Sequence, residues 1–171
     1  QVLSASIHPA NAALVTALLK PYLKEGAQVL DPFCGVGTML IERARVLKAG
    51  YMYGVDIYAN AIEKARVNAE AAEVDINFIT RDFFDFHHKY LFDEIITNMP
   101  TVTGTKSKGE IMELYERFLH KAPGMLAVGG IMAIYTTEEG ILQRCLKKCD
   151  FIKLLKRWTV REKEGSVLYV L

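Results

Sequence analysis

The hydrophobic and polar residues of this chain fall into segments with two different periods. Short runs of consecutive apolar residues are typical of strands buried on both faces, and longer segments with apolar residues three and four apart are typical of amphipathic helices. Strands are predicted at 27–31, 51–56, 75–80, 91–97, 129–136, 151–160 and 166–171. Helices are predicted at 9–24, 38–49, 60–72, 109–122 and 138–149.

The ends of several predicted helices carry recognisable signals. Pro21 and Gly26 are expected to stop the first helix, and Gly50 to close the second. Asn60 stands at the start of the third helix, where an asparagine side chain is a good N-cap. Tyr115 and Phe118 lie at helical spacing and are interpreted as a core stripe.

Strands alternate with helices along the chain, which predicts an α/β protein. The expected fold is a Rossmann-like, doubly wound, seven-stranded and mostly parallel sheet. No helix separates the last two strands, and only EKEG joins them, so we expect a C-terminal antiparallel hairpin at one edge. Ligands bind such sheets beyond the carboxyl ends of the strands, so functional residues are expected there.

Length and composition predict one globular domain over residues 1–171. The 171 residues are 51% hydrophobic and 24% charged, and the net charge of +1 does not by itself indicate nucleic-acid binding. Basic residues do gather late in the chain, either as an RNA-facing patch or as an ordinary solvated face: Arg144, Lys147, Lys148, Lys153, Lys156, Arg157, Arg161 and Lys163.

The cysteines and the N-terminal residues bear on location. An odd and sparse set, Cys34, Cys145 and Cys149, predicts reduced thiols and a cytoplasmic protein, with the last two packed in a helix and no metal site. No apolar stretch approaches the ~20 residues of a membrane span, so no membrane contact is expected. The start, QVLSASIHPAN, is unlike a signal peptide and suggests a domain cut from a longer chain.

The first predicted strand leads into a glycine-containing loop, DPFCGVGT, at residues 31–38. Gly35 and Gly37 permit a tight turn and close approach of a ligand, although a plain strand-to-helix turn has the same pattern. A full dinucleotide fingerprint needs a third glycine where this chain has Leu40. Asp31 repels phosphate but can face a cation or an amine, so a pyrophosphate is less favoured.

Acidic residues also follow the second and third predicted strands. Asp56 lies roughly 20 residues beyond Gly37, the spacing at which an acid accepts hydrogen bonds from a ribose; a helix N-cap is the alternative. Asp82 can accept from an adenine amino group, with Phe83 beside the ring, or it can cap a turn. Together the acids and the loop favour a nucleoside with a positive centre and no phosphate, such as S-adenosylmethionine (SAM).

Four segments carry a resemblance to a known family: DPFCGVGTMLIERA, GVDIYANAIEKARVNAE, RDFFDF and TNMPT. They resemble the class I SAM-dependent methyltransferases, and most of all the THUMP-associated RNA methylases that act on the exocyclic amine of guanine. The resemblance runs from about His8 to the C-terminus. In that family the loop typically reads DPFCGSGT and the motif after the fourth strand reads NPPY or NLPF.

The resemblance implies a role for particular residues. It implies SAM as cofactor and RNA (tRNA or rRNA) as partner, gripped by an N-terminal RNA-binding domain outside this sequence. It implies that Asp56 binds the ribose with Ile57 against the adenine, and that Asp82 holds the adenine amine. His8 is either a ligand contact or, more simply, the residue that begins the first helix. The remaining cofactor-binding residues implied are Asp31, Phe33, Gly35, Gly37, Thr38, Phe83 and Asn98.

The segment Asn98-Met99-Pro100 is predicted to activate an amine. An exocyclic amine is a poor nucleophile because its lone pair is delocalised into the ring. The Asn98 side-chain oxygen and the Met99 carbonyl can accept its N–H groups, and Pro100 can fix the turn between them. These three residues are the candidate catalytic group.

Thr101 departs from the family, which usually has Tyr or Phe there to stack on the flipped base. The same amine site could serve a DNA amino group or a protein glutamine amide. A nicotinamide-dependent oxidoreductase is disfavoured by Leu40, and a non-catalytic SAM- or RNA-binding module also remains open.

Overall fold

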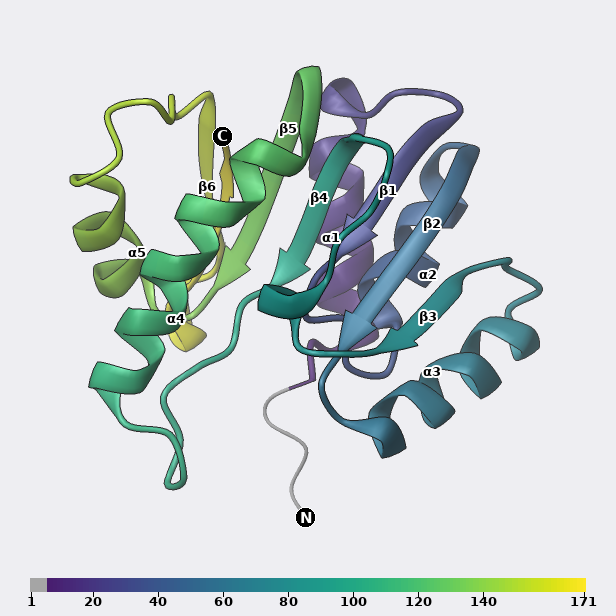
Figure 1. Ribbon diagram of the computed structural model, residues 1–171, viewed down its shortest axis with the longest axis horizontal. Helices are drawn as coiled ribbons and strands as arrows, with labels where there is room; N and C mark the ends of the chain where they lie inside the picture. The colour runs from purple at the N-terminus through teal and green to yellow at the C-terminus, as the bar shows by residue number, and fades with distance from the viewer. Residues whose placement is uncertain (1–5) are drawn as a thin grey trace.

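The computed structural model describes residues 6–171, and its centre is one seven-stranded sheet with the order β3-β2-β1-β4-β5-β7-β6 (Figure 1). The first five strands are parallel, and β7 runs antiparallel to both β5 and β6. This arrangement confirms the doubly wound fold with a C-terminal hairpin. The strands are β1 Ala27–Asp31, β2 Ala49–Asp56, β3 Asn77–Thr80, β4 Phe92–Asn98, β5 Leu126–Thr136, β6 Lys156–Arg161 and β7 Ser166–Val170.

Helices cover both faces of the sheet. Figure 1 shows α4 and α5 on one side and α1 and α2 on the other, and α3 packs on the same side as α2. The α-helices are α1 Pro9–Leu19, α2 Thr38–Val46, α3 Ala59–Ala71, α4 Lys108–Lys121 and α5 Glu139–Leu146. Residues 6–171 also contain four 3₁₀ helices in the connections between elements: η1 Lys20–Tyr22, η2 Phe83–Asp85, η3 Ala122–Met125 and η4 Glu162–Glu164.

Two hydrophobic cores lie on opposite faces of the sheet. Val15, Leu40 and Ile62 belong to the core under α1–α3, while Phe118 and Leu142 belong to the core under α4 and α5. The parallel strands are therefore covered on both faces, which explains why they read as nearly continuous apolar runs. With both faces filled, the ends of the strands are left to carry ligand-binding residues.

The predicted end of the second helix was wrong. Helix α2 stops at Val46, and Gly50 is the second residue of β2 instead of a helix terminator. A side chain at Gly50 would place its Cβ 2.6 Å from the Gly26 carbonyl oxygen. The glycine is needed because β2 starts in close contact with the turn before β1, where the Gly26 N–H donates to the Lys48 carbonyl at 2.8 Å.

Other boundaries shifted for local reasons. The first α-helix ends at Leu19, and Pro21 lies in the 3₁₀ turn that follows, since proline cannot continue the α-helical hydrogen bonds. The last hairpin begins at Lys156 instead of residue 151, and only Leu155 of the preceding segment donates to Val170. Helix α3 begins at Ala59, so Asn60 is inside it and is not its N-cap.

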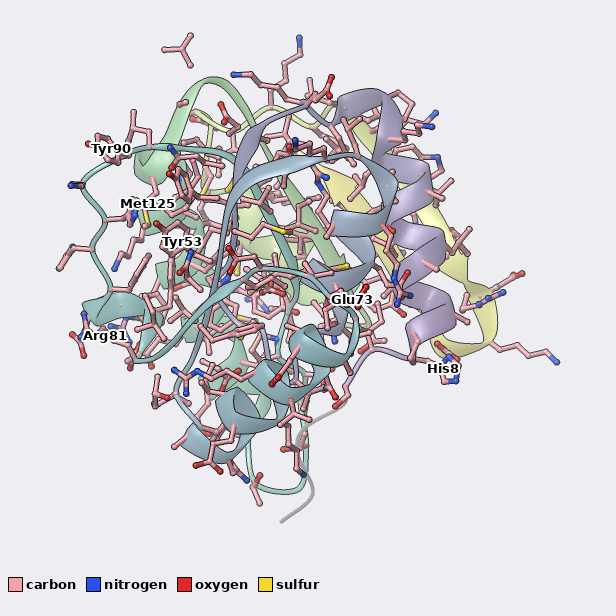
Figure 2. All side chains as sticks on the ribbon, turned by 90° about the vertical axis from the view of Figure 1, so that its right-hand side faces the viewer. His8, Tyr53, Glu73, Arg81, Tyr90 and Met125 are labelled. Atoms are coloured by element: carbon pink, nitrogen blue, oxygen red, sulfur yellow. The ribbon has the colours of Figure 1, made fainter. Side chains whose placement is uncertain are left out.

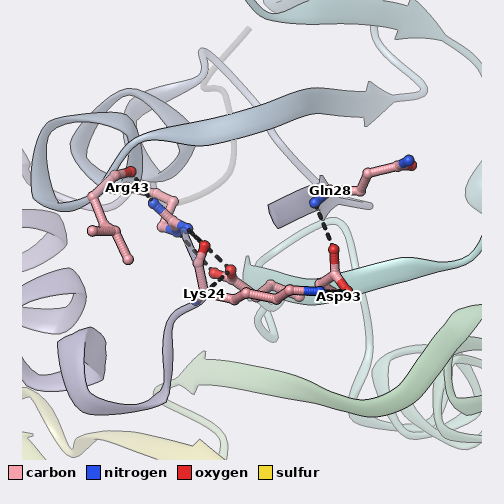
Figure 3. A network of polar contacts seen from close by, with 6 residues as sticks. Lys24, Gln28, Arg43 and Asp93 are labelled. Atoms are coloured by element: carbon pink, nitrogen blue, oxygen red, sulfur yellow. Dashed lines mark hydrogen bonds and ion pairs between the residues drawn. The ribbon is translucent and has the colours of Figure 1, made fainter. Parts of the chain in front are cut away.

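A buried ion pair joins α2 to the sheet (Figure 3). Arg43 Nε lies 2.8 Å from Glu94 Oε1 on β4, and Arg43 Nη2 lies 3.0 Å from Oε2. Both side chains are essentially inaccessible, at 0% and 1% exposure. Arg43 Nη1 also donates to the Leu47 carbonyl and Nη2 to the Lys24 carbonyl, so every nitrogen of the buried guanidinium donates a hydrogen bond.

Removing one member of this pair should be costly. We expect Arg43→Met to lower the free energy of unfolding by about 3–5 kcal/mol, because Glu94 would be left charged and unpaired in the core. The double variant Arg43→Met/Glu94→Met should recover much of that loss. Urea unfolding measures both, with Arg45→Met as control, since Arg45 pairs with Glu42 at the exposed surface. Equal losses in Arg43→Met and Arg45→Met would contradict the assignment.

Candidate functional site

A cavity of about 440 Å³ opens at the carboxyl ends of β1, β2, β3 and β4 and is bordered by α4. Its volume falls in the range of small-molecule sites. Most of the residues predicted from the sequence line it: Asp31, Phe33, Gly35, Thr38, Asp56, Ile57, Asp82, Phe83, Asn98, Met99 and Pro100. The fold thus brings together side chains that stand far apart in the sequence.

The glycine-containing loop is closed by hydrogen bonds to its own surroundings. The Phe33 N–H donates to Asp31 Oδ1 at 3.0 Å, and the Gly35 N–H donates to Asp56 Oδ2 at 2.9 Å. The Cys34 N–H donates to the Val55 carbonyl at 2.9 Å. Because the protein already satisfies these donors, the loop differs from a phosphate-binding loop, whose N–H groups point at the ligand.

Gly37 differs from the other predicted site residues because it does not line the cavity. It is the N-cap of α2, with a φ of 86° that favours glycine. A Cβ on Gly37 would lie 3.1 Å from the Phe78 ring. Gly37 therefore shapes the turn from its place against β3, and its direct contact with a cofactor stays a prediction.

Asp56 connects two of the loops that form the cavity. Its Oδ2 accepts from Gly35 in the loop after β1, and its Oδ1 accepts from the Tyr58 N–H at 2.9 Å in the loop after β2. The carboxylate also lines the cavity. Helix α3 itself has Tyr58 as its N-cap and no side chain that caps its first turn, and Asn60 Oδ1 accepts from the adjacent Ala61 N–H.

Asp31 is a buried carboxyl group in the cavity wall, with 1% of its surface exposed. Thr97 on the neighbouring strand β4 donates to Asp31 Oδ1 at 2.6 Å. Burial raises the pKa of Asp31 to about 7, and the nearby Asp56 adds to the increase, although the Thr97 hydrogen bond opposes it. Asp31 can therefore exchange a proton near neutrality.

Thr97 was not identified from the sequence. It is fully buried, in a strand whose neighbouring residues Ile95 and Ile96 are apolar. A polar residue at the end of such a run was the available signal, but its partner Asp31 became evident only from the pairing of β1 with β4.

Asp82 and Phe83 form the far side of the cavity. Asp82 Oδ1 accepts from the Phe84 N–H at 2.9 Å, so the capped-turn alternative is present, and the same side chain also lines the cavity. Phe83 is buried and packs edge-on against Phe33, with ring centroids 5.8 Å apart. Lys121 of α4 donates to the Phe83 and Phe86 carbonyls, both at 2.6 Å, which holds this turn in place.

The segment after β4 lines the cavity. Asn98 ends β4, and the Met99 N–H donates to the Tyr135 carbonyl at 2.9 Å. The Pro100 carbonyl accepts from the Tyr115 hydroxyl at 3.1 Å. Tyr115 is buried, as the core stripe predicted, but its hydroxyl also reaches this segment.

Helix α4 and the segments after β2, β3 and β4 add cavity residues that were not among the predicted site residues: Tyr58, Phe84, Lys106, Glu110, Glu113, Leu114 and Arg117. The Arg117 guanidinium lies 3.9 Å from the centre of the Phe84 ring, and Lys106 Nζ lies 5.9 Å from that of Tyr58. On the sequence alone the polar face of α4 reads as a solvated surface. Only the position of this helix over the strand ends brings it to the cavity.

Several other candidates lie outside the cavity or are inert. His8 caps α1, where its Nδ1 accepts from the Ala10 N–H at 3.1 Å, at the start of the helix in Figure 2. Burial raises the pKa of the Cys34 thiol far above its ordinary range, so the thiol remains protonated.

Residues 6–171 contain neither a metal-binding cluster nor a membrane-spanning helix. No group of three His, Cys, Asp or Glu side chains in this range could hold a metal ion. None of the helices in this range has the length and apolar character that a membrane span requires.

The raised pKa of Asp31 predicts a pH-dependent stability. Between pH 3.8 and about 7 the folded protein holds a proton on Asp31 that the unfolded chain releases, so the free energy of unfolding should fall as pH rises through this range. Asp31→Asn should remove roughly 2–4 kcal/mol of that fall. Urea titrations at several pH values compare the two proteins, and parallel pH profiles would count against the assignment.

Comparisons with known proteins identify the family of this chain. The family model of the RMKL-like methyltransferase domain matches residues 5–163. A tRNA (guanine(10)-N2)-dimethyltransferase of Methanothermobacter thermautotrophicus is 34% identical over 66% of this chain and 33% of its own length. A ribosomal protein L11 methyltransferase of Dictyoglomus turgidum is 32% identical over 92% of this chain and 48% of its own length.

A solved structure has the same fold. The crystal structure of TrmN from Thermus thermophilus superposes with a TM-score of 0.78 and 28% identity, over 95% of this chain and 51% of that one. The chain thus spans about half, or less, of the length of these three proteins. With the matched domain covering nearly all of its residues, the chain belongs to the RMKL-like methyltransferase domain family.

Proposed function

We propose that this chain is the catalytic domain of a SAM-dependent methyltransferase that modifies the exocyclic amine of a guanine in RNA. The observation that carries the proposal is one cavity that brings Asp31, Asp56 and Asp82 together with the Asn98-Met99-Pro100 segment. One of the named relatives gives it further support, since it is a tRNA (guanine(10)-N2)-dimethyltransferase.

The lining residues fit the chemistry of SAM. Asp56 offers acceptor oxygens to the ribose hydroxyls, and Asp82 offers one to the adenine amino group. Ile57, which is 57% exposed, and Phe83 present apolar surface for the adenine ring. Asp31 lies where a carboxylate can balance a positive charge, and the internally bonded loop suits a ligand without phosphate. When bound, SAM would supply an electrophilic methyl group on a sulfonium.

The segment after β4 would prepare the nucleophile. The Asn98 side-chain oxygen and the Met99 carbonyl accept the two N–H groups of the amine, which withdraws its lone pair from conjugation with the ring. These fixed dipoles also stabilise the positive charge that develops on nitrogen. The nitrogen becomes acidic as it is alkylated, so its proton can leave without a strong general base.

The cavity mouth is suited to a nucleotide. Lys106 and Arg117 bring positive charge beside the aromatic rings of Tyr58 and Phe84. Such pairs offer a flat surface for a base and a cation for a phosphate. We propose that one of these rings stacks on the base in place of the aromatic residue that the family usually has at the position of Thr101. Glu110 and Glu113 line the same mouth and can accept from base N–H groups.

The remaining parts of the proposal concern the whole protein. The net charge of +1 is low for an RNA-binding protein, so a further domain of the full protein would provide much of the RNA contact. A cytoplasmic location is in keeping with Cys34, Cys145 and Cys149, which are all free thiols.

A protein substrate is the second candidate. The ribosomal protein L11 methyltransferase of Dictyoglomus turgidum matches 92% of this chain, more than the 66% matched by the tRNA dimethyltransferase. An amine or amide of a protein side chain could occupy the same pair of acceptors. The two substrate classes therefore need a direct comparison.

Transfer of labelled methyl groups separates these candidates. We expect purified protein with methyl-labelled SAM to label total RNA from cells that lack the protein, and nucleoside analysis to place the label on the exocyclic nitrogen of guanine. Ribosomal proteins and DNA from the same cells are tested in parallel. Label in protein alone would favour the second candidate, and label in neither RNA nor protein would contradict both.

Binding and transfer should respond to different substitutions. Asp56→Ala should weaken SAM binding by about tenfold or more, because the ribose loses a charged acceptor. Asn98→Ala should reduce transfer by roughly 100-fold or more while SAM still binds, since the lost acceptor acts on the amine. Calorimetry measures SAM affinity and label transfer measures rate, with the exposed Asp75→Ala as a control. Retained turnover in Asn98→Ala would be incompatible with the mechanism.

A further inference from the structure

A chain of hydrogen bonds behind the cavity ends at the segment after β4. The Glu138 N–H, at the start of α5, lies 2.8 Å from Thr136 Oγ1 at the end of β5. Thr136 Oγ1 lies 2.6 Å from the Tyr115 hydroxyl, which in turn lies 3.1 Å from the Pro100 carbonyl oxygen. Tyr115 and Thr136 are both completely buried.

The two ends of this chain determine the direction of every proton in it. A backbone N–H can only donate, so Thr136 Oγ1 accepts from Glu138. A carbonyl can only accept, so the Tyr115 proton goes to Pro100, and Thr136 must donate to the Tyr115 oxygen. Each hydroxyl thus donates once and accepts once, an arrangement in which neighbouring bonds strengthen one another.

The same segment is held at two further points. The Met99 N–H donates to the Tyr135 carbonyl on β5, and the Val102 N–H donates to Glu138 Oε1 at 3.2 Å. Pro100 has no N–H of its own, so its carbonyl is its only backbone hydrogen-bonding group. The hydrogen bond from Tyr115 to the Pro100 carbonyl can therefore set the rotation of the peptide group that follows Pro100, next to the Met99 carbonyl.

We propose that Tyr115 and Thr136 are positioning residues that orient the Met99 carbonyl and Asn98 toward the substrate amine. This inference rests on the proposed function, in which those two groups accept the amine N–H bonds. Neither hydroxyl lines the cavity, so neither touches cofactor or substrate. Their effect on the reaction would pass through the backbone of Met99 and Pro100. Small displacements of such groups reduce rates by large factors.

The alternative is that Tyr115 only packs the core, and Tyr169 provides the matched control. Tyr169 is also a buried tyrosine on the α4–α5 side of the sheet, and its hydroxyl donates to Glu139 and accepts from Gln143. Tyr169 does not line the cavity. Loss of its hydroxyl therefore removes comparable hydrogen bonds without affecting the segment after β4.

The experiment compares Tyr115→Phe with Tyr169→Phe by two independent measurements. Tyr115→Phe should lower kcat for methyl transfer by about 10–100-fold, with SAM affinity and substrate KM nearly unchanged. It should also speed hydrogen exchange of the Met99 and Val102 amides. Tyr169→Phe should do neither at similar stability. A second pair guards against misfolding: Thr136→Ser keeps the hydroxyl and should retain activity, whereas Thr136→Val removes it and should lose activity.

The outcomes distinguish this inference from the proposed function. Equal kcat values for the wild type and Tyr115→Phe, or equal exchange at Met99 and Val102, would overturn the positioning role. If Tyr115→Phe is too unstable to assay, a kcat for Thr136→Val equal to that for Thr136→Ser would overturn it. Should the wild type methylate no substrate pool, the proposed function fails, and the amide exchange still decides whether Tyr115 holds the segment.

Discussion

The site depends on one carboxylate that joins neighbouring loops. Asp56 at the end of β2 accepts from Gly35 in the loop after β1 and from Tyr58 in its own loop. Parallel strands bring these loops to the same edge, but they do not by themselves hold them at a fixed separation. The two hydrogen bonds do so, and a ligand that binds Asp56 meets a carboxylate whose orientation is already set.

Helix α4 holds the other half of the cavity. Tyr115 donates to the segment after β4, and Lys121 donates to the turn after β3. Arg117 lies over Phe84 at the mouth between them. One helix thus holds both the turn after β3 and the segment after β4. Its position on the sheet is fixed by Phe118 and Leu119 in the core, so a shift of the helix would displace both parts of the cavity wall.

Features that depend on neighbouring residues could be predicted from the sequence, and features that depend on residues far apart in the sequence could not. The order of strands and helices followed from local periodicity, and nearly all predicted site residues line the cavity. Gly50 and Asn60 were misassigned because each was interpreted as a helix end from its own residue type. In the fold, Gly50 is required by a close approach to the Gly26 carbonyl, and α3 begins one residue before Asn60 with no side chain capping its first turn.

The sequence by itself determined the alternation of strand and helix and the chemistry of the residues after each strand, because both are written in consecutive residues. It also carried the motifs that resemble a methyltransferase. Only the tertiary structure decided that Thr97 meets Asp31, that Tyr115 reaches Pro100, and that Gly37 supports the loop from below. These contacts join residues from separate strands and helices, and their partners are chosen by sheet order and helix packing, which no local pattern encodes.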